Sequence, residues 1–393
     1  MFKDGFDDDF FDDEEHIINI AASSKFKHQD EHYNEAYKNW RSNPENKYAY
    51  NYIGDKREHA YINGRGFLTQ NPAVAERSAL IKNMNMIGFA LILAVAIEFL
   101  GPFLIVGITS LFGIAARYDI FSGINAPDGY VLIADFIIKA LSRLIPFFMI
   151  MHGMKMPKMV ALPTNVTNKD MHWLGIHLVF INVPVSSFCL GFYEKILSSF
   201  KINMWDEFFL LPENIFLRIA AFVLQVIFIP TLNEILLRGA IMQPLRQFGD
   251  SFAILASSII SALMARSITL FFFNLVVSFV VSYFVLRTGS VKTGIIMQIA
   301  FYMFVYAIYC MKVYLPDDIA GYVLTWFNFA LILIGIIILL VYMNFKRNLL
   351  TLQMQKTYIP TAEKLVYSIS SIPFAIWMLC AFVYSLMNMN FLD

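Results

Sequence analysis

The sequence predicts an all-α protein, a transmembrane helical bundle of eight or nine spans with a cytosolic N-terminal tail. Of its 393 residues, 58% are hydrophobic and only 15% are charged, a composition too apolar for a soluble domain of this size. Long apolar runs recur from about residue 84 to the C-terminus. Lys and Arg residues gather between alternate runs, as they do in cytoplasmic loops. The bilayer is therefore the expected main solvent, and membrane lipid the first expected partner.

The first 83 residues differ from the rest of the chain. Residues 1–83 are polar, begin with an acidic stretch, and hold no apolar run long enough to cross a bilayer. We expect a partly disordered cytosolic tail, in which the helix-forming residues at 30–40 predict a short surface helix. Residues 84–393 are then the transmembrane domain.

Nine apolar runs predict the membrane spans. They are 86–111, 130–151, 171–190, 215–230, 252–264, 268–286, 291–311, 322–344 and 366–387. The run at 252–264 is short, so the count is eight or nine. Lys155 and Lys158 follow the second run, and Arg287 and Lys292 follow the sixth, which places those ends inside. We expect a plasma-membrane protein with its N-terminus in the cytoplasm and its C-terminus outside.

Several function classes have no support in this composition. The net charge is zero and the chain has neither a phosphate-binding loop nor a basic strip, so nucleic acid is not an expected partner. The three cysteines lie far apart in apolar runs, which fits neither a disulfide framework nor a CxxC metal site. His172 and His177 have no carboxylate or Cys close by in sequence, and we interpret them as interfacial residues. We expect no metal and no cofactor.

Charged residues inside the apolar runs are few and should face protein or water. One helical face carries charged residues at intervals of four, which are Asp135, Lys139 and Arg143. We interpret them as structural ion-pairing residues or as side chains that snorkel to an interface. Glu98 has no partner in its own helix, so we expect it to pair across helices with Lys139 or Arg143. The remaining pair is Glu234 and Arg238.

Glu234 and Arg238 lie in a recognisable motif. The segment 231–239 reads Thr-Leu-Asn-Glu-Ile-Leu-Leu-Arg-Gly, and Leu245 and Gly249 follow it. This pattern resembles the Glu-Glu-x-x-x-Arg motif of the CAAX-protease and bacteriocin-processing (CPBP, or Abi) family of intramembrane proteases. Asn233 stands where the family has its first Glu.

Two further blocks extend the resemblance to about residues 215–311. The segment 252–260 is similar to the family's next helix, which leads into a Phe-x-x-x-His motif, and the segment 286–290 is similar to the turn before a His-x-x-x-Asn or His-x-x-x-Asp motif. Neither histidine is present here. The motif-equivalent positions are Asn233, Glu234, Arg238, Ser261, Ala265, Gln298 and Tyr302.

The resemblance implies an intramembrane endopeptidase in which the first Glu and the histidines activate a water molecule. The amide of Asn233 cannot accept a proton, and no histidine follows His177. General acid and base groups contribute about 10²- to 10⁴-fold each, so we expect little hydrolysis. Any residual activity would use Glu234 as its catalytic base.

The same residues also fit a purely structural interpretation. Thr231 and Glu234 match the S/T-x-x-E capping box, and Glu234 and Arg238 have the spacing of an ion pair within one helix. On this interpretation they start a helix inside the membrane and hold it in place.

Three functions stay open from the sequence. The first is a pseudoprotease that uses Asn233, Glu234, Arg238, Gln298 and Tyr302 to bind a membrane peptide or a transmembrane helix of a partner protein. The second is an active protease that depends on Glu234. The third is a transporter or channel with Glu98 and the Asp135, Lys139 and Arg143 series along its path.

Overall fold

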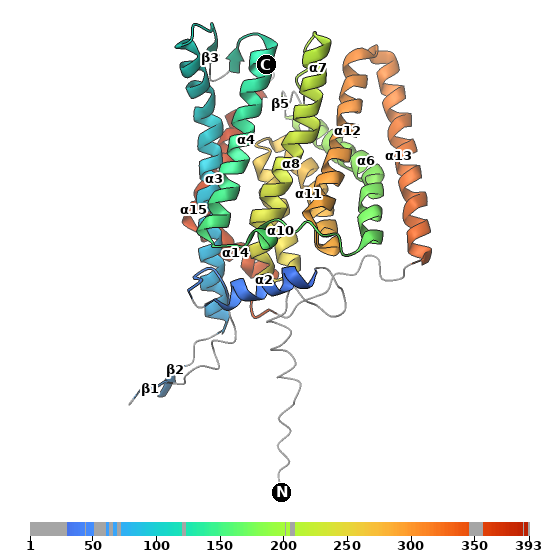
Figure 1. Cartoon of the computed structure of the whole chain (residues 1–393). Coiled ribbons are helices and arrows are strands. Elements are labelled where there is room, and N and C mark those ends of the chain that lie inside the picture. Colours follow the sequence, from blue (N-terminus) through green and yellow to red (C-terminus); the bar gives the residue numbers. More distant parts are fainter. Residues whose placement is uncertain are drawn as a thin grey trace.

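The computed structural model describes residues 30–43, 45–50, 60–62, 66–68, 72–119, 123–200, 202–204, 209–345, 357–387 and 389–391. The acidic start of the predicted tail lies outside the described residues. The described chain is a bundle of long helices, with a short helix, α2, lying across one end of it (Figure 1). The predicted all-α class is confirmed.

The bundle is built from helices that run back and forth along one direction (Figure 1). Their bounds are α2 Glu31–Ser42, α3 Pro72–Ser110, α4 Asp128–Gly153, α5 Lys158–Ala161, α6 Lys169–Ser199, α7 Ile215–Phe222, α8 Ile229–Glu234, α9 Met242–Leu245, α10 Asp250–Met264, α11 Ile268–Thr288, α12 Val291–Tyr314, α13 Asp317–Phe345, α14 Thr361–Ile369 and α15 Ile372–Met387. The strands form antiparallel pairs, which are β1 Ala60–Ile62 with β2 Gly66–Leu68, β3 Arg117–Asp119 with β4 Gly123–Asn125, and β5 Ile202–Met204 with β6 Met389–Phe391.

Six of the described helices are long and apolar enough to cross a membrane. They are Ala73–Ser110, Lys169–Ser199, Ile215–Phe248, Leu270–Thr288, Val291–Tyr314 and Asp318–Asn344. Large apolar side chains such as Leu104, Phe188 and Trp326 are exposed on their outer faces, where a soluble protein would carry polar groups. The chain is therefore an integral membrane protein.

Three of the nine predicted runs are not among these six helices. The run at 130–151 lies within α4 and is not counted as a span. The run at 366–387 is divided between α14 and α15, which meet at an angle of 81°. The break is local in origin, because Pro373 has no N–H to continue the helix and the Ser371 hydroxyl accepts from the Phe374 N–H. Counted as one span, this bent pair raises the total to seven, whereas α10 has only 15 residues, about 22 Å of helix. The count of eight or nine stays a prediction.

The predicted surface helix is present as α2 and is anchored to the bundle. Asp30 caps it by accepting the Tyr33 N–H at 2.7 Å. Tyr33, Tyr37 and Trp40 recur on one face and are buried. The Trp40 indole donates to the Met154 carbonyl at 2.9 Å. This part of the predicted tail is thus packed against the membrane domain, and α3 begins at Pro72, within the segment expected to be tail.

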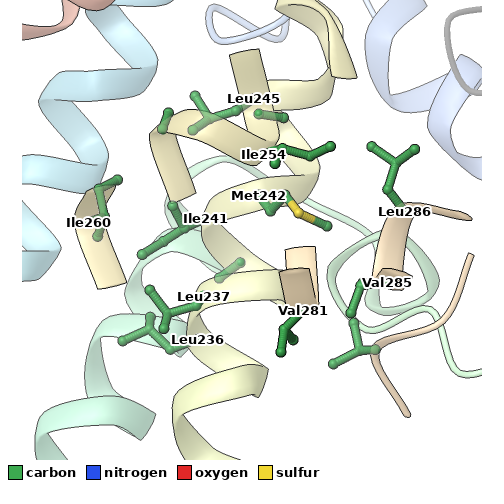
Figure 2. Close-up of a cluster of buried hydrophobic side chains, with 14 of the residues drawn as sticks. Leu236, Leu237, Ile241, Met242, Leu245, Ile254, Ile260, Val281, Val285 and Leu286 are labelled. Atoms are coloured by element: carbon green, nitrogen blue, oxygen red, sulfur yellow. The ribbon is translucent and has the colours of Figure 1, made fainter. Parts of the chain in front are cut away.

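The core of the bundle surrounds the helix that carries Glu234. Figure 2 shows apolar side chains from this helix meeting side chains of α10 and α11. They include Leu236, Leu237, Ile241, Met242, Leu245, Ile254, Ile260, Val281, Val285 and Leu286, each at most 3% exposed. Close packing on this scale holds the backbone around Glu234 in one position.

Candidate functional site

The helix at 215–248 is irregular on both sides of Glu234. π-Helical segments at Val223–Phe228 and Ile235–Ile241 flank α8. Pro230 lacks the N–H that a regular helix needs there. π-Helical segments are rare and occur mostly as short bulges inside α-helices, frequently at functional sites. The Thr231 hydroxyl donates to the Ile227 carbonyl at 2.6 Å. The predicted capping box is therefore wrong, because the helix continues through this point instead of beginning at it.

Glu234 and Arg238 form the expected ion pair, and both side chains are 0% exposed. Arg238 Nε lies 3.4 Å from Glu234 Oε2. Arg238 also donates through Nη2 to the backbone oxygen and the hydroxyl of Ser278, at 3.0 and 2.8 Å. Gln298 Nε2 donates to Glu234 Oε1 at 3.3 Å. The first and third matched motif blocks therefore meet at the Glu234 carboxylate.

A glycine makes this meeting possible. A Cβ on Gly294 would lie 2.6 Å from Glu234 Oε2 and 2.6 Å from Val285 Cγ2, closer than carbon atoms approach their neighbours. Gly294 lies one turn before Gln298 on α12. The absent side chain lets α12 approach α8 closely enough for Gln298 to reach the carboxylate.

The motif-equivalent positions surround a cavity of about 220 Å³. Six of the seven line it, and these are Asn233, Glu234, Ser261, Ala265, Gln298 and Tyr302. Arg238 is not among the lining residues and holds Glu234 through its ion pair. Residues from α8, α10 and α12, predicted to share a site from motif order alone, are thus brought together.

The sequence interpretation did not place two charged residues of α4 in this cavity. Lys139 and Arg143 on α4 also line it. Lys139 pairs with Asp135 at 2.8 Å, as expected for two residues four apart. Arg143 does more than the predicted structural role, because its Nε donates to Asn233 Oδ1 at 2.9 Å.

A charge cluster extends from Arg143 to α3. Arg143 Nη1 and Arg266 Nη1 pair with different oxygens of the same Glu98 carboxylate, and the Ser142 hydroxyl donates to it at 2.8 Å. Arg266 also lies over the ring of Tyr384, with its Cζ 5.3 Å from the centroid. The predicted pairing of Glu98 with Arg143 is confirmed. The second partner, Arg266, had no sequence signal, because it lies in the turn after α10.

The two histidines singled out from the sequence lie away from this cavity. His172 Nδ1 is 2.8 Å from Thr293 Oγ1, and His177 Nδ1 is 2.7 Å from the Trp173 carbonyl oxygen. Within the described ranges, no group of three or more His, Cys, Asp or Glu side chains could hold a metal ion.

Comparison with known proteins identifies the segment that contains the site. Residues 215–304 match the Rce1-like family model, whose description is "Type II CAAX prenyl endopeptidase Rce1-like". No curated protein and no solved structure matches the chain. The matched segment is less than a quarter of the 393 residues, and it contains all seven motif-equivalent positions. Over residues 215–304, this membrane protein is therefore similar to the Rce1-like family of type II CAAX prenyl endopeptidases.

Proposed function

We propose that this protein is a pseudoprotease whose cavity binds a membrane peptide, or the transmembrane helix of a partner protein, without cutting it. One observation carries the proposal. Asn233, Ala265 and Gln298 stand where the family resemblance expects an acid and two histidines, and all three line the same cavity as Glu234. A cavity is present at the positions where the resemblance expects a peptidase site, whereas most of the groups that would activate water there are replaced.

The chemistry supports inactivity. Of the described side chains that line the cavity, only Glu234 carries a carboxylate. A missing general base costs about 10²- to 10⁴-fold in rate, and a missing oxyanion donor about 10²- to 10³-fold. Glu234 in turn is engaged by Arg238 and by Gln298. Losses of this size together leave little room for peptide hydrolysis.

The same side chains support binding. Asn233, Asn274, Gln298 and Tyr302 line the cavity and carry hydrogen-bonding groups. A peptide that enters the membrane must satisfy its backbone N–H and C=O groups, since hydrocarbon offers them no partners. A polar cavity within an apolar bundle supplies such partners.

An active protease that uses Glu234 is the second candidate. It is favoured by Glu234 Oε2, which accepts no hydrogen bond from the described residues and belongs to a cavity-lining side chain. Transport stays a prediction that none of these observations tests.

A cleavage assay separates the first two candidates. The purified protein would be reconstituted with fluorogenic prenylated and unprenylated membrane peptides, beside the Glu234→Gln variant. We expect no cleavage by either protein. Cleavage that disappears in Glu234→Gln would overturn the pseudoprotease proposal. Activity gained by the triple variant Asn233→Glu, Ala265→His and Gln298→His would show that the cavity keeps the shape for the reaction.

We also infer that the protein resides in the plasma membrane, with its tail and N-terminus in the cytoplasm and its C-terminus outside. Helix α2 and strand β6 lie at opposite ends of the bundle, which supports opposite sides for the two termini (Figure 1). Lys155 Nζ lies 4.0 Å from Glu45 Oε2, and Lys158 begins α5, which contacts α2. Asp119 ends β3, which lies at the opposite end of the bundle from α2 (Figure 1). This distribution supports a cytoplasmic α2.

A further inference from the structure

Positively charged side chains outnumber negatively charged ones in the group of residues around the cavity. Glu234 is matched by Arg238, and Asp135 by Lys139. The guanidinium groups of Arg143 and Arg266, in contrast, share the one carboxylate of Glu98. Among the described residues, this cluster therefore carries one positive charge more than its carboxylate neutralises.

Arg143 presents this charge to the cavity. The residue is 8% exposed and lines the cavity, with Nε bound to Asn233 and Nη1 bound to Glu98. Its Nη2 has no hydrogen-bond partner in the part of the chain that the structure describes. This atom is not among the fully buried side-chain atoms, so it is accessible. A buried cation inside a membrane protein is costly, and such groups commonly face a counter-ion on a ligand.

The substitution at position 233 accounts for the imbalance. Arg143 Nε donates to Asn233 Oδ1 at 2.9 Å, where the motif of the family would place a Glu carboxylate. A Glu there would be a second acid for the two arginines. The amide that removes the expected base thus also leaves Arg143 without a full charge partner.

Gln298 supplies a second, independent observation. It is 8% exposed and lines the cavity. Its Nε2 donates to the Glu234 carboxylate, which fixes the orientation of the amide because a carboxylate accepts and does not donate. Its Oε1 is buried and has no hydrogen-bond partner among the described residues. This acceptor requires an N–H or O–H donor from whatever occupies the cavity.

We propose that the peptide bound in this cavity is recognised through a carboxylate, which pairs with Arg143, and through a neighbouring N–H, which donates to Gln298 Oε1. This inference rests on the proposed peptide-binding function and assigns the chemistry of its ligand. A peptide carries amide N–H groups beside every side chain, whereas a phosphodiester lipid headgroup such as phosphatidylcholine offers an anionic oxygen and no donor. The two unsatisfied groups together therefore favour a peptide acid over a lipid phosphate.

A pair of matched peptides tests this proposal. The probes are a fluorescent hydrophobic membrane peptide with a single Glu in its apolar segment, and the same peptide with Gln in its place. Binding is measured with the full chain in phosphatidylcholine nanodiscs. The Glu peptide is expected to bind about 10-fold or more tightly than the Gln peptide, the range for a hydrogen bond to a charged group.

Variants assign the preference to Arg143. Asn233→Glu supplies the missing carboxylate within the protein, and is expected to bring the Glu and Gln peptides to nearly equal affinity. Arg143→Gln is expected to do the same. Asn233→Glu keeps the test valid if Arg143→Gln does not fold. Arg218→Gln, at an arginine of α7 that does not line the cavity, is the matched control and should keep the preference.

The outcomes are distinguishable. Equal binding of both peptides to the parent protein would overturn the carboxylate assignment and leave peptide binding standing. No binding of either peptide would overturn the proposed function, and this inference with it. Displacement of the Glu peptide by phosphatidic acid in the discs, in the parent protein but not in Asn233→Glu, would reassign the site to a lipid phosphate and refute the peptide ligand.

Discussion

Replacing Arg238 by Met tests how the site is held together. The change keeps a long side chain but removes the guanidinium, and with it the contact to Glu234 at 3.4 Å and two hydrogen bonds to Ser278. Glu234 is 0% exposed and would keep only the Gln298 amide at 3.3 Å. Removing one partner of a buried pair costs about 3–5 kcal/mol, because the remaining charge is buried without compensation. We expect Arg238→Met to lower the free energy of unfolding by this amount.

The double variant Glu234→Gln with Arg238→Met should recover most of that loss. Replacing a whole buried pair by neutral groups of similar size is often neutral or stabilising. The pair Asp135 and Lys139 is the matched comparison, with the same spacing of four residues and a shorter distance of 2.8 Å. Its side chains are 43% and 42% exposed, so its loss should cost at most about 1 kcal/mol. Burial, and not distance, is predicted to rank the two pairs.

The assay is equilibrium unfolding in mixed micelles with a rising fraction of dodecyl sulfate, followed by tryptophan fluorescence. Trp377 is 1% exposed and reports on the packed bundle. An Arg238→Met variant within about 1 kcal/mol of the parent protein would refute the reasoning. A double variant as unstable as the single one would refute it equally, since the cost would then come from lost packing and not from an unpaired charge.

Three further predictions concern other parts of the molecule. Gly294→Ala should destabilise the protein by about 1–3 kcal/mol in the same assay, because its Cβ would overlap the Glu234 carboxylate. Burial raises the pKa of the Tyr33 phenol from 10 to about 12, so the folded state holds this proton more tightly than the unfolded state. The free energy of unfolding should therefore fall as the pH rises from 10 to 12. Tyr33→Phe should make that fall shallower in urea or dodecyl sulfate titrations at stepped pH, and an unchanged slope would contradict the burial effect. A reporter that is active only outside the cytoplasm should give signal when fused to the C-terminus, and silence would show that the number of crossings or the orientation is wrong.

The members of the cavity were predictable because of helical spacing. Gln298 and Tyr302 lie four apart on α12 and share one face of it. Ser261 lies in the last turn of α10, and Ala265, four residues on, directly follows that helix. Motif order and spacing sufficed to select these positions. That the helices bring them to one cavity is a result of the packing around Glu234.

The Glu98 cluster was only half predictable. The sequence showed an acid without a partner in its own helix, which indicated a contact between helices. It could not show that Arg266 is the second partner, because that residue lies in a turn where a charge ordinarily meets solvent. Its backbone has a φ of 50°, in the left-handed region that few residues other than glycine adopt. Only the three-dimensional arrangement of α3, α4 and this turn reveals the shared carboxylate.

Asn233, in place of a Glu, accounts both for the missing catalytic acid and for the excess positive charge of the Glu98, Arg143 and Arg266 cluster. A last prediction about stability follows. Asn233 accepts from Arg143 Nε at 2.9 Å, so a Glu at this position would place a carboxylate within reach of an arginine that now shares its partner. Hydrogen bonds to charged groups contribute about 1.5–3 kcal/mol, and desolvation of the new acid is limited because position 233 lines the cavity. Asn233→Glu is therefore expected to raise the free energy of unfolding, although most substitutions near a buried site lower it. It should still not cleave peptides, because Ala265 and Gln298 remain in place of the expected histidines. A destabilised Asn233→Glu variant would show that Arg143 already has a sufficient counter-charge, and the carboxylate-binding proposal would lose its electrostatic basis.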